Sequence, residues 1–345
     1  METALYKKIE ESIKEKIRAQ GFPSGKLPPE RALLLEYGVS RDTLRVALAE
    51  LVRQGLLLSL PRKGNFVNSR GAGAAGPSKT NLGILYLSKA SSPLNRISCV
   101  FKGIDNIAGK FKFKVQYYLI TEERTEDLKK ELLEENIRAV LLLQPLPQKF
   151  LRWLSENNIR VITVNFYYGT ADISLSAVVP DQQKAGFLAA KHLLDLGCRR
   201  TGIILDSLKE EYGNIRVSYL VKNGYIEALK ARGLVIDEAL IKCGEWDRSS
   251  IRKDFEGLLE KKVDGLVCSS ELVLEKLLEV LREKKIVPGR ELKLVSLCEK
   301  DRIYPFPTVG LPYVELGESA VMLANMLINN NAGPQKIVLD TVLRV

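Results

Sequence analysis

Residues 27–67 read LPPERALLLEYGVSRDTLRVALAELVRQGLLLSLPRKGNFV, and this stretch decides how the amino-terminal part of the chain folds. It predicts two short amphipathic helices that meet at residues 37–40, YGVS. Glycine at position 38 permits the turn, and the Ser40 hydroxyl can cap the second helix. The stretch therefore indicates a helix-turn-helix.

The second helix, which we expect to run to about residue 54, has two different faces. Arg41, Asp42, Thr43 and Arg45 lie near its N-terminal end on the outer face, where recognition helices contact bases. After Gly55 the chain predicts two short strands around a basic tip, which is typical of a wing. The inner face carries the apolar residues that recur at helical spacing: Leu44, Ala47, Leu48 and Leu51.

This stretch and the helix expected before it resemble the winged helix of the GntR family of bacterial transcription regulators. One departure is Pro29, where the family usually has a serine cap; proline suits the first turn of a helix. The resemblance rests on residues at fixed offsets, which are Leu5-Tyr6, Ile9, Leu27-Pro28, Glu30-Arg31, residues 38–41, Leu44-Arg45, Ala47-Leu48, Gly55-Leu56, Gly64 and Phe66-Val67.

The resemblance also implies which residues touch DNA. Arg31, Arg41 and Arg45 fall on the family's DNA-contacting positions, with Thr43 beside them. The wing tip, Lys63-Gly64, would approach the minor groove. The alternative for these charged residues is a solvated helix face, and a wing-tip lysine can equally be an ordinary surface residue.

Charge is concentrated on the same part of the chain. The 345 residues carry a formal net charge of +10, and residues 1–70 hold 13 Lys and Arg against 8 Asp and Glu, which leaves +5 on a fifth of the chain. Positive charge there is what phosphate neutralisation requires. The overall composition, 46% hydrophobic and 27% charged, is that of ordinary folded domains.

The sequence offers little for catalysis, metal binding or membrane insertion. A single histidine, His192, leaves His-based catalysis and zinc sites without residues, and no nucleotide-binding or hydrolase motif occurs. We therefore expect no enzyme activity, no cofactor and no metal. No run approaches the roughly 18 apolar residues of a membrane span, so we expect a cytoplasmic protein without membrane contact. The cysteines are widely spaced, which is typical of reduced thiols: Cys99, Cys198, Cys243, Cys268 and Cys298.

Beyond the helix-turn-helix, a small glycine-rich stretch, SRGAGAAGPSKT, predicts a linker over residues 69–80. From residue 81 onward, short apolar runs alternate with amphipathic helices, which predicts an α/β fold with two open, mostly parallel sheets. The expected domains are a winged helix at 1–68 and a two-lobed effector-binding and dimerisation domain at 81–345. We expect lobe 1 at about 81–198 and 299–328, and lobe 2 at about 199–298 and 329–345.

A second resemblance covers this two-lobed part. Residues 181–205, DQQKAGFLAAKHLLDLGCRRTGIIL, are similar to the central signature of the LacI-type, periplasmic-binding-protein-like (type I) sensor domain. A winged helix joined to this sensor resembles the arabinose-type repressors in architecture. Supporting matches span residues 81–345 and include Gly103-Ile104, Gly224-Tyr225, Thr308-Val309 and Leu316-Gly317.

The effector contacts typical of that family are where the sequence departs from it. Val221 and Ser270-Glu271 occupy positions where relatives carry an arginine and an Asn-Asp pair that bond sugar hydroxyls. Valine cannot donate a hydrogen bond, so that clamp is lost unless Arg216 or Lys222 reaches in. Open sheets bind ligands at the carboxyl ends of their strands. By strand-end position we expect these further residues at the cleft: Ser91, Asn95, Asn165, Phe166, Asp206 and Glu299.

Plainer explanations exist for some of these residues. Asp181 and Ser270 can cap the helices that they open, and Glu271 is favoured at a helix N-terminus by the helix dipole. His192 lies in an apolar helical pattern that favours a packed histidine.

Together the two resemblances imply a sequence-specific bacterial transcription regulator that represses as a homodimer on a roughly palindromic operator and lies on the nucleoid when bound. A small molecule in the cleft, such as a sugar or related metabolite, would modulate DNA binding. The alternative is a DNA-binding regulator with a degenerate, ligand-free sensor that serves only dimerisation.

Overall fold

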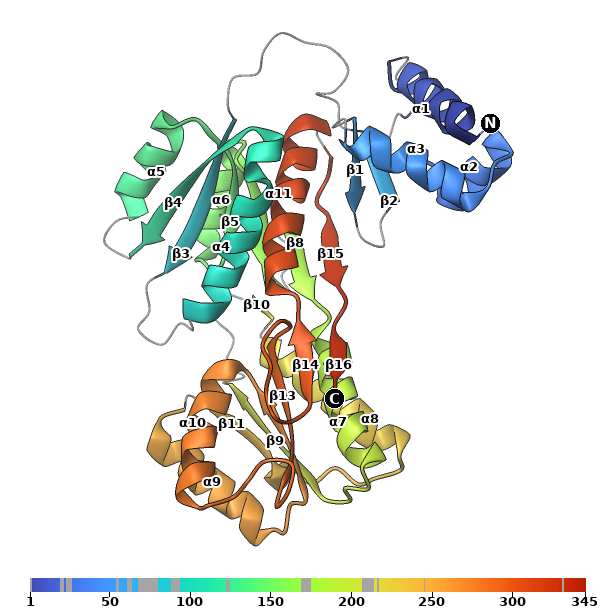
Figure 1. The fold of residues 1–345 in the computed structure, drawn as a ribbon. Helices are drawn as coiled ribbons and strands as arrows, with labels where there is room; N and C mark the ends of the chain where they lie inside the picture. Colours follow the sequence, from blue (N-terminus) through green and yellow to red (C-terminus); the bar gives the residue numbers. More distant parts are fainter. Residues whose placement is uncertain are drawn as a thin grey trace.

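A computed structural model provides the structure of the chain. It describes residues 2–18, 22, 27–53, 56–60, 64–67, 80–87, 94–121, 125–168, 175–206, 214–215, 217–244, 246–330 and 332–345. A small N-terminal domain lies beside one of two α/β lobes, and the lobes stack end to end (Figure 1). The expected linker lies outside the described residues except for Thr80, which opens a strand.

The N-terminal domain is the expected winged helix. Its elements are α1 (Glu2–Arg18), α2 (Glu30–Tyr37), α3 (Arg41–Arg53) and the antiparallel strands β1 (Leu57–Leu60) and β2 (Gly64–Val67). The Leu27 N–H donates to the Asn65 carbonyl at 2.9 Å, which ties the segment before α2 to the wing. Its core consists of buried apolar residues from all three helices, from β1 and from the segment before α2: Ile9, Ile13, Ile17, Leu27, Leu33, Leu44, Ala47, Leu48, Leu51 and Leu57.

Gly38 makes the turn between α2 and α3. Its φ of +60° lies in the left-handed region that glycine adopts without strain, and its N–H donates to the Leu34 carbonyl at 3.0 Å. α2 is thereby closed and the chain is redirected, so that α3 begins three residues later. The helix-turn-helix geometry follows from this one backbone conformation.

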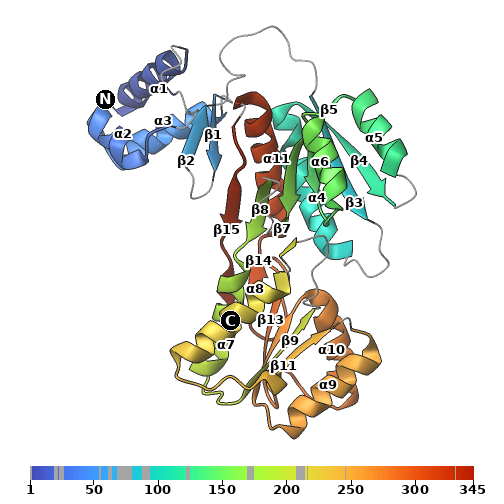
Figure 2. The same cartoon turned by 180° about the vertical axis from the view of Figure 1, so that it is seen from behind.

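Lobe 1 is built on a parallel sheet with strand order β15-β8-β6-β5-β3-β4. Helices cover both faces of the sheet, which is why its strands are almost wholly apolar. Among the helices, α11 packs along α4 and crosses β6 (Figures 1 and 2). The elements are β3 (Thr80–Leu87), α4 (Leu94–Ala108), β4 (Phe113–Ile120), α5 (Thr125–Glu134), β5 (Ile137–Leu142), α6 (Gln148–Glu156), β6 (Arg160–Val164), β8 (Ser176–Pro180), α11 (Tyr313–Asn330) and β15 (Lys336–Leu339).

Lobe 2 repeats this design with strand order β11-β9-β12-β13-β14-β16. Within the described residues its neighbouring strands are parallel, except that β16 runs antiparallel to β14. The elements are α7 (Gln182–Asp195), β9 (Thr201–Asp206), α8 (Val217–Ala231), β11 (Ile241–Gly244), α9 (Arg248–Glu260), β12 (Gly265–Ser269), α10 (Glu271–Glu283), β13 (Lys293–Glu299), β14 (Thr308–Leu311) and β16 (Val342–Arg344).

The chain passes between the lobes at residues 180–182, 311–313 and 339–342, and these crossings lie side by side. The Asp181 N–H donates to the Leu339 carbonyl at 2.8 Å, and the Thr341 hydroxyl donates to the Asp181 carbonyl at 3.4 Å. A further link is the short antiparallel pairing of β7 (Tyr167–Tyr168), which follows β6, with β10 (Asn214–Ile215), which precedes α8.

These crossings differ from the lobe bounds that we expected. α7 packs on β13, β14 and β16 and so belongs to lobe 2, as does the whole segment 299–311. β15 joins β8 in lobe 1, whereas we expected residues 329–345 in lobe 2. The alternation of strands and helices along the chain does not reveal which sheet a strand joins, because β15 finds its partner more than 150 residues earlier.

Pairs of glycines bring helices into close contact in both lobes. A Cβ on Gly103 would lie 1.9 Å from the Val314 carbonyl oxygen, and one on Gly317 would lie 2.1 Å from that of Val100. In lobe 2, a Cβ on Gly186 would lie 2.1 Å from the Val221 oxygen. α4 and α11, and likewise α7 and α8, therefore touch backbone to backbone at positions that only glycine can occupy.

Candidate functional site

The first turn of α3 is prepared for surface contact by a serine cap. The Ser40 Oγ accepts a hydrogen bond from the Thr43 N–H at 3.2 Å and lies 2.8 Å from the Thr43 hydroxyl. The cap satisfies a backbone donor that would otherwise be unpaired at the helix start. It also orients Thr43, so the expected DNA-contacting threonine is fixed beside the arginines on a rigid helix end.

The expected DNA-contacting arginines all lie on the surface. Arg31, Arg41 and Arg45 are exposed, whereas Leu44, between the last two, is fully buried. The Arg45 Nε lies 3.6 Å from a Glu30 carboxylate oxygen on α2, which holds the Arg45 guanidinium near the start of both helices. The helix therefore presents cations outward over an apolar inner face.

The wing is less fully described. Lys63, expected at its tip, lies outside the described residues, and Gly64 opens β2. The wing strands also contact lobe 1, because the Asn330 side-chain amide donates to the Val67 carbonyl at 3.2 Å. The end of α11 therefore meets the end of β2, and β1 contacts the same helix.

The second candidate site lies where the carboxyl ends of the strands in the two lobes face each other (Figures 1 and 2). Two glutamates from lobe 2 lie there, joined through a backbone hydrogen bond. Glu271, the first residue of α10, accepts a hydrogen bond on Oε1 from the Glu299 N–H at 3.3 Å. Glu299, at the end of β13, accepts on Oε2 from the Asp301 N–H at 2.6 Å. Both glutamates are more than nine-tenths buried.

Arg302 completes this group, which we call the interlobe cluster: Glu271, Glu299 and Arg302. The Arg302 Nε lies 3.3 Å from Glu271 Oε1, and its Nη1 lies 3.9 Å from Glu275 and 3.3 Å from the Tyr304 hydroxyl. Sequence reasoning missed Arg302 because it lies in the loop three residues beyond β13, where the strand-end rule no longer locates a side chain.

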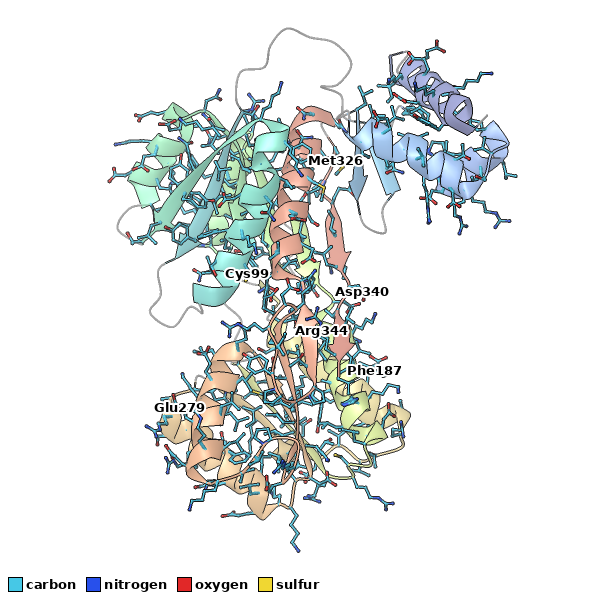
Figure 3. The ribbon with its side chains drawn as sticks, in the orientation of Figure 1. Cys99, Phe187, Glu279, Met326, Asp340 and Arg344 are labelled. Carbon is cyan, nitrogen blue, oxygen red and sulfur yellow. The ribbon has the colours of Figure 1, made fainter. Side chains whose placement is uncertain are left out.

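The electrostatic effect of the interlobe cluster extends to a thiol of lobe 1. Burial raises the pKa of the Cys99 thiol on α4, and the carboxylates of Glu299 and Glu271 raise it further, against the opposing effects of Arg302 and Lys102. Figure 3 labels Cys99 near the end of α4 that faces lobe 2. The cluster therefore faces α4 across the boundary between the lobes.

Asn165 and Phe166 follow β6 on the lobe 1 side, as expected. Asn165 has a φ of +72°, a conformation that asparagine tolerates better than most residues, and its N–H donates to the Val178 carbonyl at 2.8 Å. Phe166 is 6% exposed and packs in the lobe 1 core, edge to face with Tyr168. Its ring is therefore largely committed to the core and offers little surface for stacking.

Other expected cleft residues have local roles or lie outside the description. The Ser270 Oγ accepts from the Val273 N–H at 3.4 Å, so Ser270 caps α10, and Asp181 likewise caps α7. Asp206 ends β9 at the same face and is half-buried. Asn95 lies in the first turn of α4. Ser91 and Arg216 lie outside the described residues.

Val221 occupies the position where the resemblance leads one to expect an arginine. It is fully buried in the core that α7 and α8 share, and its carbonyl oxygen packs against Gly186. A long cationic side chain has no place in this contact between the helices. The apolar Val221 side chain therefore fits the packing of α7 against α8.

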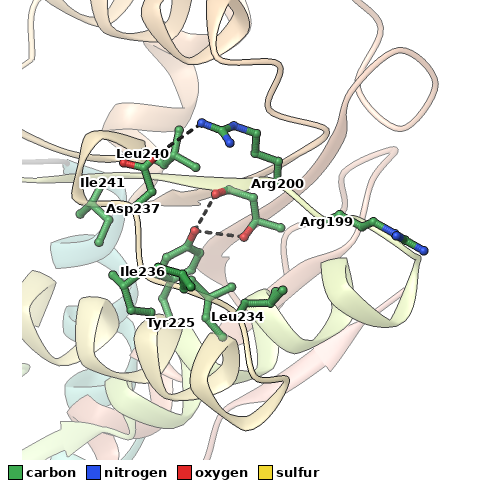
Figure 4. Close-up of a pocket in the computed structure, with 11 residues that line it drawn as sticks. Arg199, Arg200, Tyr225, Leu234, Ile236, Asp237, Leu240 and Ile241 are labelled. Atoms are coloured by element: carbon green, nitrogen blue, oxygen red, sulfur yellow. Dashed lines mark hydrogen bonds and ion pairs between the residues drawn. The ribbon is translucent and has the colours of Figure 1, made fainter.

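A separate pocket of about 190 Å³ lies at the opposite, amino end of β9 (Figure 4). The Tyr225 hydroxyl donates to the Thr201 carbonyl at 2.8 Å, and Arg200 pairs with Asp237 at 3.2 Å at the rim. These polar groups satisfy one another, and the pocket is far along the strand from the interlobe cluster.

Two families of known proteins match different parts of the chain. Residues 5–67 match bacterial regulatory proteins of the gntR family, and residues 190–345 match the periplasmic binding protein-like domain. The arabinose metabolism transcriptional repressor of Halalkalibacterium halodurans is 26% identical over 94% of this chain and 88% of its own length. The repressor of the same description from Geobacillus stearothermophilus is 24% identical over 90% and 87%.

Solved structures show the same fold. The transcription regulator CcpA of Lactococcus lactis superposes with a TM-score of 0.66 at 22% identity, over 78% of this chain and 98% of that one. A complex of the transcriptional regulator CelR with cellobiose gives 0.66 at 21% identity, over 89% and 90%.

The chain thus consists of a GntR-family helix-turn-helix domain followed by a LacI-like, periplasmic-binding-protein-like α/β domain, which confirms both resemblances. Among the described helices, none is both long enough and apolar enough to cross a bilayer.

Proposed function

We propose that this protein is a sequence-specific DNA-binding transcription repressor, and that a small molecule bound between its two lobes modulates its operator binding. The observation that carries the proposal is the capped, cationic start of α3, joined in one chain to a two-lobed domain with buried charge at its facing strand ends. The relatives that cover most of the chain are described as arabinose metabolism repressors, which supports repression rather than enzyme activity.

DNA reading would follow from the exposed face of α3. Arg41 and Arg45 would donate to guanine edges in the major groove, because an arginine can bond the guanine O6 and N7 together. Arg31 and Thr43 would hold phosphates, and the wing tip with Lys63 and Gly64 would approach the minor groove. Glu30 would orient the Arg45 guanidinium before DNA is bound.

A homodimer would place two such helices on half-sites about one helical turn apart, so the operator would be roughly palindromic. The protein would work in the cytoplasm and lie on the nucleoid when bound. The net charge of +10 favours this association with a polyanion.

α11 connects the boundary between the lobes with the winged helix, so it could transmit the effect of a bound ligand to the DNA-binding surface. It begins directly after the crossing at residues 311–313 and ends at Asn330, whose side chain contacts the wing. Near its start, Glu315 pairs with Lys300 of lobe 2. A ligand that changes the angle between the lobes would move the start of α11 at the crossing. Because the end of the same helix contacts the wing, the position of the wing would change with it. Such coupling requires that the ligand bind the two arrangements with different affinity.

The test is a gel shift at fixed salt on the promoter region of the protein's own gene. Arg45→Ala should weaken binding about 5- to 150-fold for each half-site and relax the preference at one base pair there, because a bidentate arginine–guanine contact contributes about 1–3 kcal/mol. Arg152→Ala, on the exposed face of α6, serves as the matched control. An Arg45→Ala variant with unchanged affinity and sequence preference would refute the assignment of α3.

Val221 favours a second candidate, a regulator whose sensor binds no ligand and serves only dimerisation. Its apolar burial removes the donor that clamps sugar hydroxyls in relatives. A thermal-shift screen of the full chain against neutral, cationic and phosphorylated sugars separates the two. No shift with any compound, together with intact operator binding, would support the ligand-free sensor.

A further inference from the structure

Buried acceptor atoms without partners lie at strand ends on both sides of the boundary between the lobes. Glu271 Oε2 and Glu299 Oε1 are inaccessible to solvent and find no hydrogen-bond partner within the described residues. The Asn165 Oδ1 atom, at the end of β6 on the other lobe, is in the same condition. A buried acceptor without a donor is unfavourable, and more so if it is charged, so these atoms call for a donor that the chain does not supply among its described residues.

The charge of the interlobe cluster is negative. Its two carboxylates face one guanidinium, which contacts only Glu271 Oε1 within the cluster and is also drawn toward Glu275. One oxygen of each carboxylate therefore remains unneutralised. Burial raises the pKa of the Cys99 thiol on lobe 1, and the Glu299 and Glu271 carboxylates raise it further, in keeping with this negative charge.

The kinds of donor that fit these atoms follow from their chemistry. An ammonium group carries three donors and a positive charge, so it matches carboxylate oxygens both as a donor and in charge. The neutral Asn165 amide oxygen suits a hydroxyl group. A calcium ion fits poorly, because it takes six to eight oxygen ligands and the two carboxylates offer one free oxygen each. An anionic ligand such as a sugar phosphate would face repulsion.

We propose that the effector site selects a polyhydroxylated amine of the amino-sugar type, with its ammonium group on Glu271 and Glu299 and a hydroxyl group on Asn165. This inference rests on the proposed function and specifies the ligand class of the same site. In this proposal the carboxylates replace the hydroxyl clamp that is lost at Val221. The site would therefore bind a positively charged sugar derivative rather than a neutral sugar.

Calorimetric titration of the full chain with three matched probes tests this: D-glucosamine, D-glucose and glucose 6-phosphate. Glucosamine should bind at least about tenfold more tightly than glucose, because hydrogen bonds to charged groups contribute roughly 1.5–3 kcal/mol. Glucose 6-phosphate should bind most weakly. Equal binding of glucose and glucosamine, tighter binding of the phosphate, or binding of none of the three would overturn the proposal.

Substitutions at the proposed contact residues test which side chains produce the preference for glucosamine over glucose. Glu271→Gln and Glu299→Gln should each abolish most of the glucosamine preference over glucose, whereas Glu279→Gln, on the outer side of the same helix α10 (Figure 3), should leave it unchanged. Asn165→Asp adds a carboxylate from lobe 1 and should increase the preference; aspartate tolerates the same positive φ. Because the readout is a ratio of two affinities, partial loss of folded protein does not imitate the effect.

The gel shift is run on the same preparations. Intact operator binding without a glucosamine preference would end this inference alone, whereas loss of sequence-specific DNA binding in the parent protein would end the proposed function.

Discussion

Alanine at Gly224 should destabilise lobe 2 although alanine is the better helix former. A Cβ at this position would lie 1.8 Å from the Gln183 carbonyl oxygen and 2.8 Å from the Phe187 nitrogen, both backbone atoms of α7. Neither can rotate away, so the two helices must separate by more than an ångström. Overpacking of this kind costs about 3 kcal/mol or more, and the gain in helix propensity returns about 1 kcal/mol.

The net loss is therefore about 2 kcal/mol, which should lower the melting temperature of the two-lobed domain by roughly 4–8 °C. Differential scanning calorimetry of the full chain separates this transition from that of the winged helix. Gly257→Ala on α9 is the matched control, since a Cβ there meets nothing within 4 Å. The control should be stabilised by up to about 1 kcal/mol. A Gly224→Ala protein that melts at or above the parent would refute the close contact between α7 and α8.

Two further substitutions follow from single interactions. Ser40→Ala removes the cap of α3 and should destabilise the winged helix by about 1 kcal/mol, measured by the circular dichroism melt of the first transition; an unaltered midpoint would show that the cap contributes nothing. Asp195→Asn tests acid stability: the hydrogen bond from Lys191, at 2.5 Å, lowers the pKa of Asp195 from its ordinary 3.8, with Arg232 acting in the same direction. Because the folded pKa is depressed, this carboxylate stabilises the fold above the unfolded value and the contribution is lost as the pH falls through the folded pKa. The melting temperatures of Asp195→Asn and the parent should therefore converge as the pH is lowered below 3.8, and a constant difference from pH 7 to pH 2 would contradict this.

The winged helix could be predicted from sequence because each feature that determines its fold depends on residues close together in the chain. Gly38 sets the turn, Ser40 the cap, and the apolar residues of α3 the inner face, all within a few positions of one another. The alternation of strands and helices likewise predicted two parallel sheets. In both cases neighbouring residues along the chain carry the whole signal.

The lobe bounds and the interlobe cluster depend on contacts between distant segments. β15 joins β8 across the sequence, and Arg302 reaches Glu271 from a loop, so neither strand periodicity nor strand-end position reveals them. Gly186 and Gly224 were visible as parts of a family pattern. Only the structure shows why these positions are glycine, because the backbones of two helices are in contact there. From the sequence, Val221 indicated only a missing hydrogen-bond donor. The structure shows that its side chain packs in the core that α7 and α8 share.

The antiparallel pairing of β7 with β10 has a consequence for how the lobes can move. It joins the segment that carries Asn165 to the segment that leads into α8, at a place separate from the three crossings of residues 180–182, 311–313 and 339–342. While this pairing holds, it limits how far the lobes can separate on that side. A ligand of the proposed interlobe site would then have to enter and leave on another side of the boundary.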